Sequence, residues 1–194
     1  MPSEVRIQTL REASGKSAED LWEPYDLIFA SANRVCPCRQ SFWYDDFMKA
    51  MADRSFYKII ARINEEIVGI VICTFDLQKV SWINPEFYWQ PREFHGKMFD
   101  FRGKVCYVVS IGVVEDKRKI QIGSRLMKVL KRILRSENGW AVAFDFSVNI
   151  NPRLPSLIRI VTGGEAIGLL PEGVMDYQAQ CLMVDPIILE PAPV

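Results

Sequence analysis

A β-branched run, a basic turn and an amphipathic helix follow one another over residues 105–134. Residues 105–114 read VCYVVSIGVV, which predicts a strand, and residues 115–124 read EDKRKIQIGS. Residues 125–134 read RLMKVLKRIL and predict a helix, because their apolar residues fall on one side. A strand that leads onto a helix N-terminus directs backbone N–H groups at one point. The segment therefore predicts a site for phosphate groups.

Length and composition bound the rest of the interpretation. With 194 residues, the chain predicts one sizeable domain spanning 1–194. Its apolar content of 49% and charged content of 25% are ordinary for a soluble globular protein, and 24 basic residues balance 24 acidic ones. No apolar run is long enough for a membrane span, and the first residues contain no apolar signal region. We expect a cytoplasmic protein without an integral membrane segment.

The cysteines argue against disulfides and metal. Five are scattered along the chain, an odd number that favours a reduced, intracellular state. Cys36 and Cys38 are too closely spaced for the usual zinc knuckle, and His95 is the only histidine. We therefore expect no metal site.

Alternating and helical patterns predict a mixed α/β fold. A strand over Val5–Leu10 precedes a helix that begins at Ser17 or Pro24 and runs to about Arg34, and a second helix follows Ser41. Further elements are expected as strands at Phe56–Ile63 and Ile67–Phe75 around a turn at 64–66, a strand at Trp140–Val148, a helix at Pro155–Val161, and a closing strand pair at Glu165–Leu170 and Tyr177–Ile188. The result is a sheet with antiparallel hairpins at both ends and helices on its faces.

Residues 77–104 form an aromatic insert that the pattern predicts to be irregular. Seven aromatic rings lie in it, interrupted by Pro85, Pro91, Gly96 and Gly103. A loop of this length inside a compact domain is often a lid or a binding wall. It could line an apolar tunnel for an acyl chain, or its rings could simply anchor the loop to the core.

The order of elements and one motif resemble the GNAT N-acyltransferase superfamily. Its signature, Arg/Gln-x-x-Gly-x-Gly/Ala, corresponds to residues 118–123, and Val113 lies five residues upstream, where the family's strand ends. Asn151-Pro152 and Gly163-Gly164 also fall at family positions. The resemblance implies a mixed, mostly antiparallel sheet of six to seven strands. About four helices flank this sheet, and its fourth and fifth strands splay apart.

The resemblance also implies a donor site and a reaction. The pantetheine arm of an acyl thioester would pair with the backbone of Ile111, Gly112 and Val113. The phosphates would rest on residues of the turn and helix start, which are Arg118, Lys119, Gln121, Ile122, Gly123 and Ser124. The expected enzyme is an acyltransferase, of the kind that moves groups other than aminoacyl groups. It would transfer the acyl group from acyl-CoA or a phosphopantetheine-linked donor to a primary amine by direct attack.

Two positions depart from the family pattern. Gln121 replaces the first glycine of the motif, so the pyrophosphate of coenzyme A can approach the backbone less closely there. Many family members have a tyrosine in the helix after the Asn that protonates the departing thiolate. Here the corresponding residue is Leu157 or Ile158, so that role falls to water or to another group.

The outer face of the helix predicted at 125–134 is strongly basic. Residues 117–135 carry eight positive charges and no negative one. The face is either simply solvated or a docking surface for an acidic partner, such as the 3′-phosphate of coenzyme A or an acyl carrier protein. The docking residues would be Arg125, Lys128, Lys131, Arg132 and Arg135. Aromatic residues do not interleave with these charges, so nucleic acid is not expected.

A carrier-linked donor would suit the lost motif glycine, since a carrier presents a single phosphate. The segments Asn151-Pro152-Arg153 and 184–187 resemble long-chain N-acyl amino acid synthases, which together with autoinducer synthases are GNAT-like enzymes. An amino acid is therefore one possible amine acceptor. Two other classes stay open, a catalytically inert GNAT-like binding module and a nucleic-acid-associated protein.

Direct attack needs a neutral amine, and so a group that takes its proton. Asp145 on the predicted strand at 140–148 and His95 in the insert are the candidates. Asp145 could equally be a structural carboxylate, and His95 an exposed loop residue. A backbone N–H near Ile111 to Val113 would stabilise the oxyanion, a contribution of about 3 kcal/mol.

Overall fold

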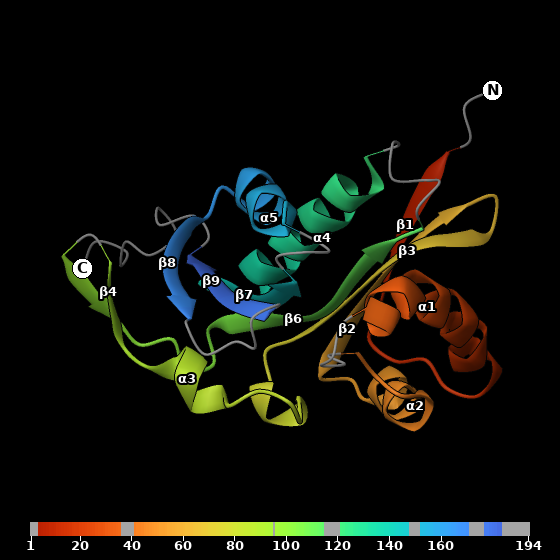
Figure 1. The fold of residues 1–194 in the computed structure, drawn as a ribbon, viewed down its shortest axis with the longest axis horizontal. Coiled ribbons are helices and arrows are strands. Elements are labelled where there is room, and N and C mark those ends of the chain that lie inside the picture. The colour runs from red at the N-terminus through yellow and green to blue at the C-terminus, as the bar shows by residue number, and fades with distance from the viewer. Residues whose placement is uncertain are drawn as a thin grey trace. The chain divides into compact units, whose positions relative to one another are not determined.

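The computed structural model describes residues 4–35, 41–94, 96–114, 121–147, 152–170 and 177–183 (Figure 1). The chain forms two compact units, of which unit 1 comprises Met1–Thr74 and Val108–Val129, and unit 2 comprises Phe75–Tyr107 and Leu130–Val194. The elements of unit 1 are β1 (Val5–Leu10), α1 (Lys16–Val35), α2 (Tyr44–Ala52), β2 (Phe56–Ile63) and β3 (Glu66–Thr74). Those of unit 2 are the 3-10 turn η1 (Leu77–Lys79), α3 (Pro85–Trp89), β4 (Arg92–Phe94), β5 (Lys97–Phe99), β7 (Ala141–Ser147), α5 (Leu154–Thr162), β8 (Glu165–Leu170) and β9 (Tyr177–Met183). Strand β6 (Val105–Val113) and helix α4 (Ile122–Ser136) run through both.

This arrangement confirms the expected mixed α/β class and the expected order of elements. Within unit 1 the strand order is β1-β2-β3-β6, and within unit 2 it is β6-β7-β9-β8. The pairs β1/β2, β2/β3, β7/β9 and β8/β9 are antiparallel. The small strands β4 and β5 form a separate sheet. Five α-helices are described where about four were expected, because α3 lies in the insert.

The turn between β2 and β3 confirms the predicted hairpin. Ile63 pairs with Glu66, which leaves Asn64 and Glu65 as a two-residue loop. Both have positive φ, 49° and 67°, the conformation that a type I′ turn requires. Nearly every residue of β2 and β3 is buried, so unit 1 builds its core on both faces of these strands.

Helices α1 and α2 pack side by side against β2 and β3 (Figure 1). Helix α1 begins at Lys16, and Ser17 lies inside its first turn, hydrogen-bonded to Ser14. The helix continues through Pro24, so of the two expected starts the one at Ser17 is correct to within one residue and the one at Pro24 is wrong. Pro24 removes one N–H donor, and the packing of the buried face outweighs that loss.

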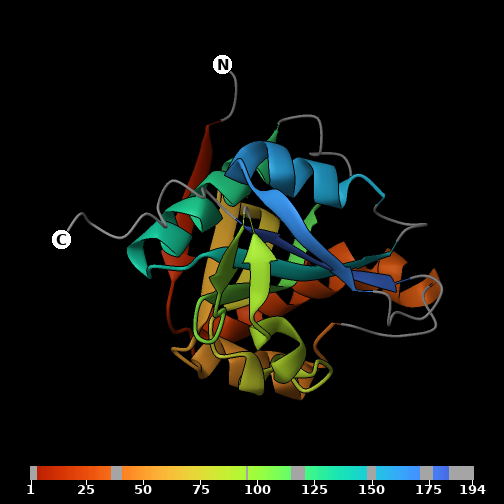
Figure 2. The same cartoon turned by 90° about the vertical axis from the view of Figure 1, so that its left-hand side faces the viewer.

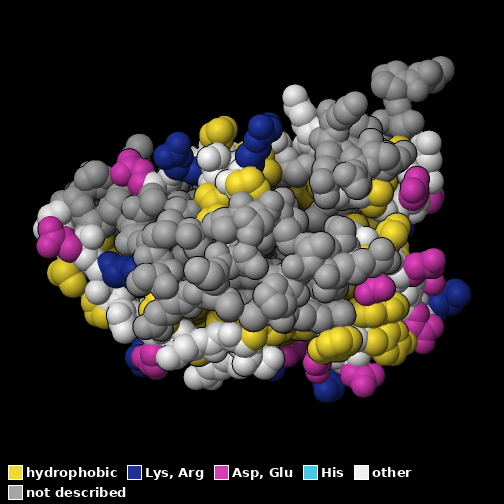
Figure 3. All heavy atoms as spheres, viewed as in Figure 1, with side chains coloured by type: hydrophobic (Ala, Val, Ile, Leu, Met, Phe, Trp, Pro, Cys, Tyr) yellow, Lys and Arg dark blue, Asp and Glu magenta, His cyan; other side chains and the backbone are white. Residues whose placement is uncertain are grey.

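The outer side of this helix pair is apolar and acidic. Figure 3 shows hydrophobic side chains gathered over α1 and α2, with acidic ones beside them. The exposed apolar residues there are Leu27, Trp43 and Tyr44, and Asp45 and Asp46 follow in the first turn of α2. This surface of unit 1 is therefore unlike the basic face of α4.

The insert at 77–104 is more regular than its pattern predicts. It contains η1, α3 and the hairpin of β4 and β5, which Figure 2 shows side by side. Asn84 caps α3 by accepting a hydrogen bond from the Glu86 amide, and Pro85 occupies the first turn, where its missing N–H costs little. The expectation of an irregular segment is thus wrong, because short-range caps supply its structure.

Lys58 of β2 is buried in unit 1 and donates to two backbone carbonyl groups. Its Nζ donates to the carbonyl oxygens of Arg11 (2.8 Å) and Asp53 (2.7 Å), the second of which is the C-terminal cap of α2. Burial lowers the pKa of the Lys58 ammonium to about 8, while the Asp53 charge raises it and the Arg11 charge lowers it. The buried charge therefore ties β1, β2 and α2 together at a cost in desolvation.

The stability of the protein should rise with pH above 8 because of Lys58. Between pH 8 and 10.5 the unfolded chain holds a proton that the folded protein has released, so the free energy of unfolding increases. From pH 8 to 9.5 the gain is about 1.5 kcal/mol. Urea denaturation should show this rise in the wild type and lose it in Lys58→Met. The exposed-lysine variant Lys49→Met should keep it, and equal slopes in all three proteins would contradict the assignment.

Candidate functional site

The end of strand β6 becomes partly accessible where the donor site was predicted. Residues 105–110 are buried, whereas Ile111, Gly112 and Val113 are only half-buried. Val114, the residue after the strand, donates its N–H to the carbonyl of Val68 on β3 (3.0 Å). Unit 1 therefore holds the end of β6 in its sheet and leaves part of this end accessible.

Glycine at position 112 is required by the close approach of α1. A Cβ at Gly112 would overlap Ile28 Cγ2 and lie 3.2 Å from Phe29 Cζ, both on α1. On β3, a Cβ at Gly69 would lie 3.0 Å from Leu126 Cδ1 and 3.4 Å from the Gly112 carbonyl. Helices α1 and α4 thus pack against neighbouring strands through two positions that lack side chains.

The turn into α4 places Gln121 in the left-handed conformation. Its φ is 55°, and its carbonyl accepts from the Arg125 amide (3.2 Å) as the helix begins. The N–H groups of Ile122, Gly123 and Ser124 belong to the first turn of α4, where an α-helix has no internal acceptors for them. Such a helix end is suited to an anion. Residues Arg118 and Lys119 lie outside the described residues.

Asp145 of β7 accepts hydrogen bonds from two tyrosines of unit 2. Tyr107 Oη donates to Oδ2 at 2.8 Å and Tyr88 Oη donates to Oδ1 at 3.2 Å. Both rings are buried and meet edge to face, with centroids 5.6 Å apart. The Asp145 side chain is only partly buried, so the carboxylate keeps some access to solvent or ligand.

The environment of this cluster favours protonated forms. Burial raises the pKa of the Asp145 carboxyl above its usual 3.8, and the hydrogen bonds from Tyr107 and Tyr88 partly offset the rise. Burial, with the neighbouring Asp145 charge, raises the pKa of Tyr107 well above 10. Tyr107 is thus a neutral donor at physiological pH, and Asp145 is a more basic carboxylate than one in water.

Sequence reasoning identified Asp145 but missed its partners. Tyr88 lies in the aromatic insert and Tyr107 in the strand predicted at 105–114, and nothing local marks a contact with Asp145, which is 57 and 38 residues away. His95 lies outside the described residues. On α5, Ile158 is buried and Leu157 half-buried, so the apolar replacement of the family tyrosine belongs to the packing of unit 2.

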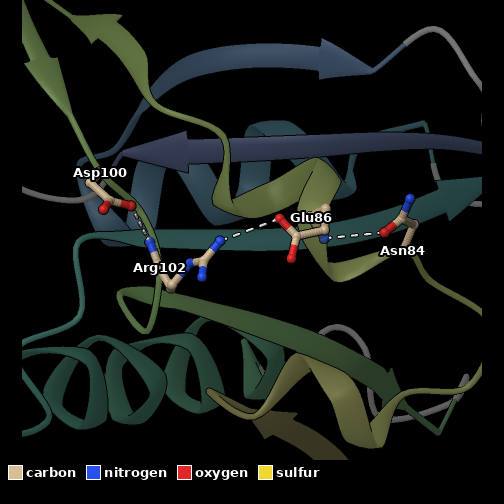
Figure 4. A network of polar contacts seen from close by, with 4 residues as sticks. All are labelled: Asn84, Glu86, Asp100 and Arg102. Atoms are coloured by element: carbon tan, nitrogen blue, oxygen red, sulfur yellow. Dashed lines mark hydrogen bonds and ion pairs between the residues drawn. The ribbon is translucent and has the colours of Figure 1, made fainter.

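Polar contacts within the insert join the start of α3 to the segment after β5 (Figure 4). Arg102 Nη2 lies 3.4 Å from Glu86 Oε2, the Arg102 amide donates to Asp100 Oδ1 at 3.0 Å, and Asn84 caps α3. The Arg102 guanidinium also lies 5.5 Å from the centre of the Trp89 ring. These contacts, with Phe101 and Tyr88 buried, favour a structural role for many of the insert's rings.

The basic face of α4 is present. Arg125, Lys128 and Arg132 are exposed, while Leu126, Met127, Leu130, Ile133 and Leu134 are buried. The first turn of α4 contains no acidic residue. Among the described residues no helix is long and apolar enough to cross a membrane, and no cluster of three or more metal-ligating side chains occurs.

A comparison with protein families finds one match to this chain. The model described as "Acetyltransferase (GNAT) family" matches residues 18–155, more than two thirds of the sequence. This range contains the end of β6, the start of α4 and Asp145. No curated protein sequence matches the chain.

Solved structures with the same fold share little sequence with the chain. Ard1 from Thermoplasma volcanium is 14% identical, with a TM-score of 0.57 over 93% of this chain and 97% of that one. The ribosomal-protein-S18-alanine N-acetyltransferase from Escherichia coli is 11% identical, with a TM-score of 0.59 over 93% and 94%. NAA60 from Arabidopsis thaliana in complex with acetyl-CoA is 15% identical, with a TM-score of 0.59 over 92% and 98%. At these identities the similarity shows the fold.

Replacing Gln121 with glycine should stabilise the protein. Its left-handed backbone costs a non-glycine residue about 1 kcal/mol, which glycine avoids. Thermal denaturation should show a higher melting temperature for Gln121→Gly. The matched variant Gln8→Gly, at an exposed position in β1, should lower the melting temperature, because glycine weakens a strand. A lower melting temperature in Gln121→Gly would contradict the strained turn.

Proposed function

The chain belongs to the acetyltransferase (GNAT) family, and we propose that it is an N-acyltransferase that moves an acyl group from acyl-CoA to a primary amine. Family membership confirms the expected enzyme class, which transfers acyl groups other than aminoacyl groups. The donor, the acceptor and the residue roles given below are parts of the proposal. A reducing compartment such as the cytoplasm suits the buried thiols of Cys73 and Cys106, neither of which forms a disulfide.

The end of β6 together with the start of α4 carries the proposal. The half-buried residues Ile111–Val113 end the strand that we assign to the amide groups of a pantetheine arm, which would pair with it as an added strand pairs with a sheet. Helix α4 begins at Ile122, nine residues after Val113, and the N–H groups of its first turn, which have no acceptors within the helix, can donate to the phosphates. A backbone N–H of Ile111–Val113 is also the donor we assign to the oxyanion of the tetrahedral intermediate.

Asp145 is the group that we assign to the amine proton. The neutral amine nitrogen attacks the thioester carbonyl, the C–S bond breaks, and the nitrogen loses a proton to the Asp145 carboxylate. Its raised pKa makes Asp145 a better base than an exposed aspartate, and the two tyrosine hydroxyls fix its orientation. Since α5 contains no tyrosine, water is the simplest donor of the proton that converts the thiolate into a thiol.

Thiol release tests the function directly. Purified protein, acetyl-CoA and a panel of primary amines (polyamines, amino acids and N-terminal peptides) are combined, and free thiol is measured. Release of thiol that depends on both substrates supports the proposal. Binding of coenzyme A without turnover on any amine would favour the inert binding module instead.

Asp145→Asn should lower turnover by about 10²- to 10⁴-fold, because the amide cannot take the amine proton. In the wild type, kcat/KM should fall toward acidic pH as the Asp145 carboxyl protonates, at a pH above that of an ordinary aspartate. The variant should lose this acidic limb. The exposed-residue variant Asp100→Asn should keep both rate and profile. If Asp145→Asn folds and retains the wild-type rate, Asp145 is a structural carboxylate.

The basic face of α4 favours a second candidate, a donor carried by an acyl carrier protein. Arg125, Lys128 and Arg132 recur at helical spacing and are exposed, and acidic carriers are attracted to such a face. On this alternative the enzyme is a long-chain N-acyl amino acid synthase, and the acceptor is an amino acid. The similar segment at 184–187 lies outside the described residues.

Charge reversal distinguishes the two donors. Lys128→Glu/Arg132→Glu should weaken the binding of an acyl carrier protein at least tenfold. The KM for acyl-CoA should stay nearly unchanged, because only the carrier needs a docking surface. Lys16→Glu/Lys49→Glu, with the same change in charge on α1 and α2, is the control. Equal weakening of both donors would instead assign the face to the phosphates of coenzyme A, and no effect would leave it as a solvated surface.

A further inference from the structure

Tyr25 of α1 joins two distant parts of unit 1 through one hydroxyl. Its Oη lies 3.1 Å from Ser110 Oγ on β6, and it accepts a hydrogen bond from the Phe42 amide, just before α2, at 2.9 Å. The partners are 85 and 17 residues away in sequence, and the Tyr25 side chain is completely buried. Breaking these bonds would leave polar groups in the core without partners, so the contact is well fixed.

The Ser110 contact lies beside the strand end assigned to the acyl donor. Ser110 directly precedes Ile111, and because side chains alternate along a strand, it shares a face with Gly112. At Gly112 the α1 residues Ile28 and Phe29 approach the backbone too closely for any side chain. Helix α1 therefore holds β6 at two successive positions on one face, by a hydrogen bond and by direct packing.

The Tyr25 ring leaves its hydroxyl little freedom. The ring packs against Phe29 of α1, with centroids 4.8 Å apart, and against Phe47 of α2, at 4.7 Å. Phe42 lies on the same ring at 6.5 Å. Because the ring is closely packed, its hydroxyl also restricts the positions of the two groups that it bonds, the Ser110 hydroxyl and the Phe42 amide.

We propose that Tyr25 is a positioning residue that sets the end of β6 for the acyl donor and couples it to the segment entering α2. The inference rests on the proposed function, since it needs β6 to be the donor strand. Tyr25 does not touch the donor. It acts through Ser110, whose neighbours Ile111–Val113 offer their backbone to the pantetheine arm. Loss of the hydroxyl frees the strand end while the ring keeps its packing.

A double-mutant cycle measures this coupling. The dissociation constant of coenzyme A is measured by titration calorimetry for the wild type, Tyr25→Phe, Ser110→Ala and the double variant, well below their melting temperatures. Each single variant should raise the dissociation constant about fivefold. The double variant should raise it no further than the more affected single variant, because the two substitutions remove the same Tyr25–Ser110 hydrogen bond. Tyr44→Phe, an exposed tyrosine on α2, should bind as the wild type does.

The outcomes separate the inference from the function on which it rests. If the wild type binds coenzyme A and the two variants bind equally well while melting at lower temperature, Tyr25 is merely structural and the inference is wrong. Additive weakening in the double variant would also overturn it. If the wild type neither binds coenzyme A nor releases thiol with any amine, the proposed function itself fails, and the inference fails with it.

Discussion

The close packing of helices on two glycines is the constraint on which unit 1 depends. At Gly112 the side chains of α1 occupy the space where a Cβ would lie, and at Gly69 a Cβ would lie 3.0 Å from Leu126 and 3.1 Å from Ile122 of α4. Ile122 and Leu126 are completely buried against the strands as a result, which contributes roughly 2 kcal/mol for each side chain. This packing fixes the distance between the start of α4 and the strands. It therefore also fixes the position of the N–H groups in the first turn of α4.

The two units contain different kinds of candidate chemical group. Unit 1 contributes backbone groups, at the end of β6 and the start of α4, whose direction is set by packing. Unit 2 contributes a side chain, Asp145, whose proton affinity is set by burial and two phenol donors. The first kind of site tolerates many sequences because every residue except proline has a backbone N–H, which suits a fold that this chain shares with proteins of 11–15% identity.

The sequence predicts the regular elements well for physical reasons. Strands β2 and β3 are β-branched runs around a two-residue turn, and α4 has a single apolar side, so their periods are visible locally. The apolar side predicts this helix over residues 125–134, and the structure begins it three residues earlier, at Ile122. The insert was harder, because caps such as Asn84 act over two residues and leave little pattern.

Contacts between distant residues account for what was missed. The bond between Tyr25 and Ser110 and the bonds around Asp145 join positions that no short pattern relates. Gly69 did carry a signal, since a lone glycine inside a β-branched run suggests close approach of another backbone or helix. The left-handed φ of Gln121 could not be inferred, because glutamine itself does not favour it.

The donors to Asp145 have a consequence for the ionic environment of the site. Tyr107 and Tyr88 orient the carboxylate without bringing a positive charge to it, unlike an arginine or lysine partner. The hydroxyl groups of the two tyrosines are dipoles that act at short range on a partly buried carboxylate. Dissolved salt screens such hydrogen bonds far less than it screens the attraction between two full charges. A carboxylate held this way keeps nearly the same proton affinity from dilute buffer to high ionic strength.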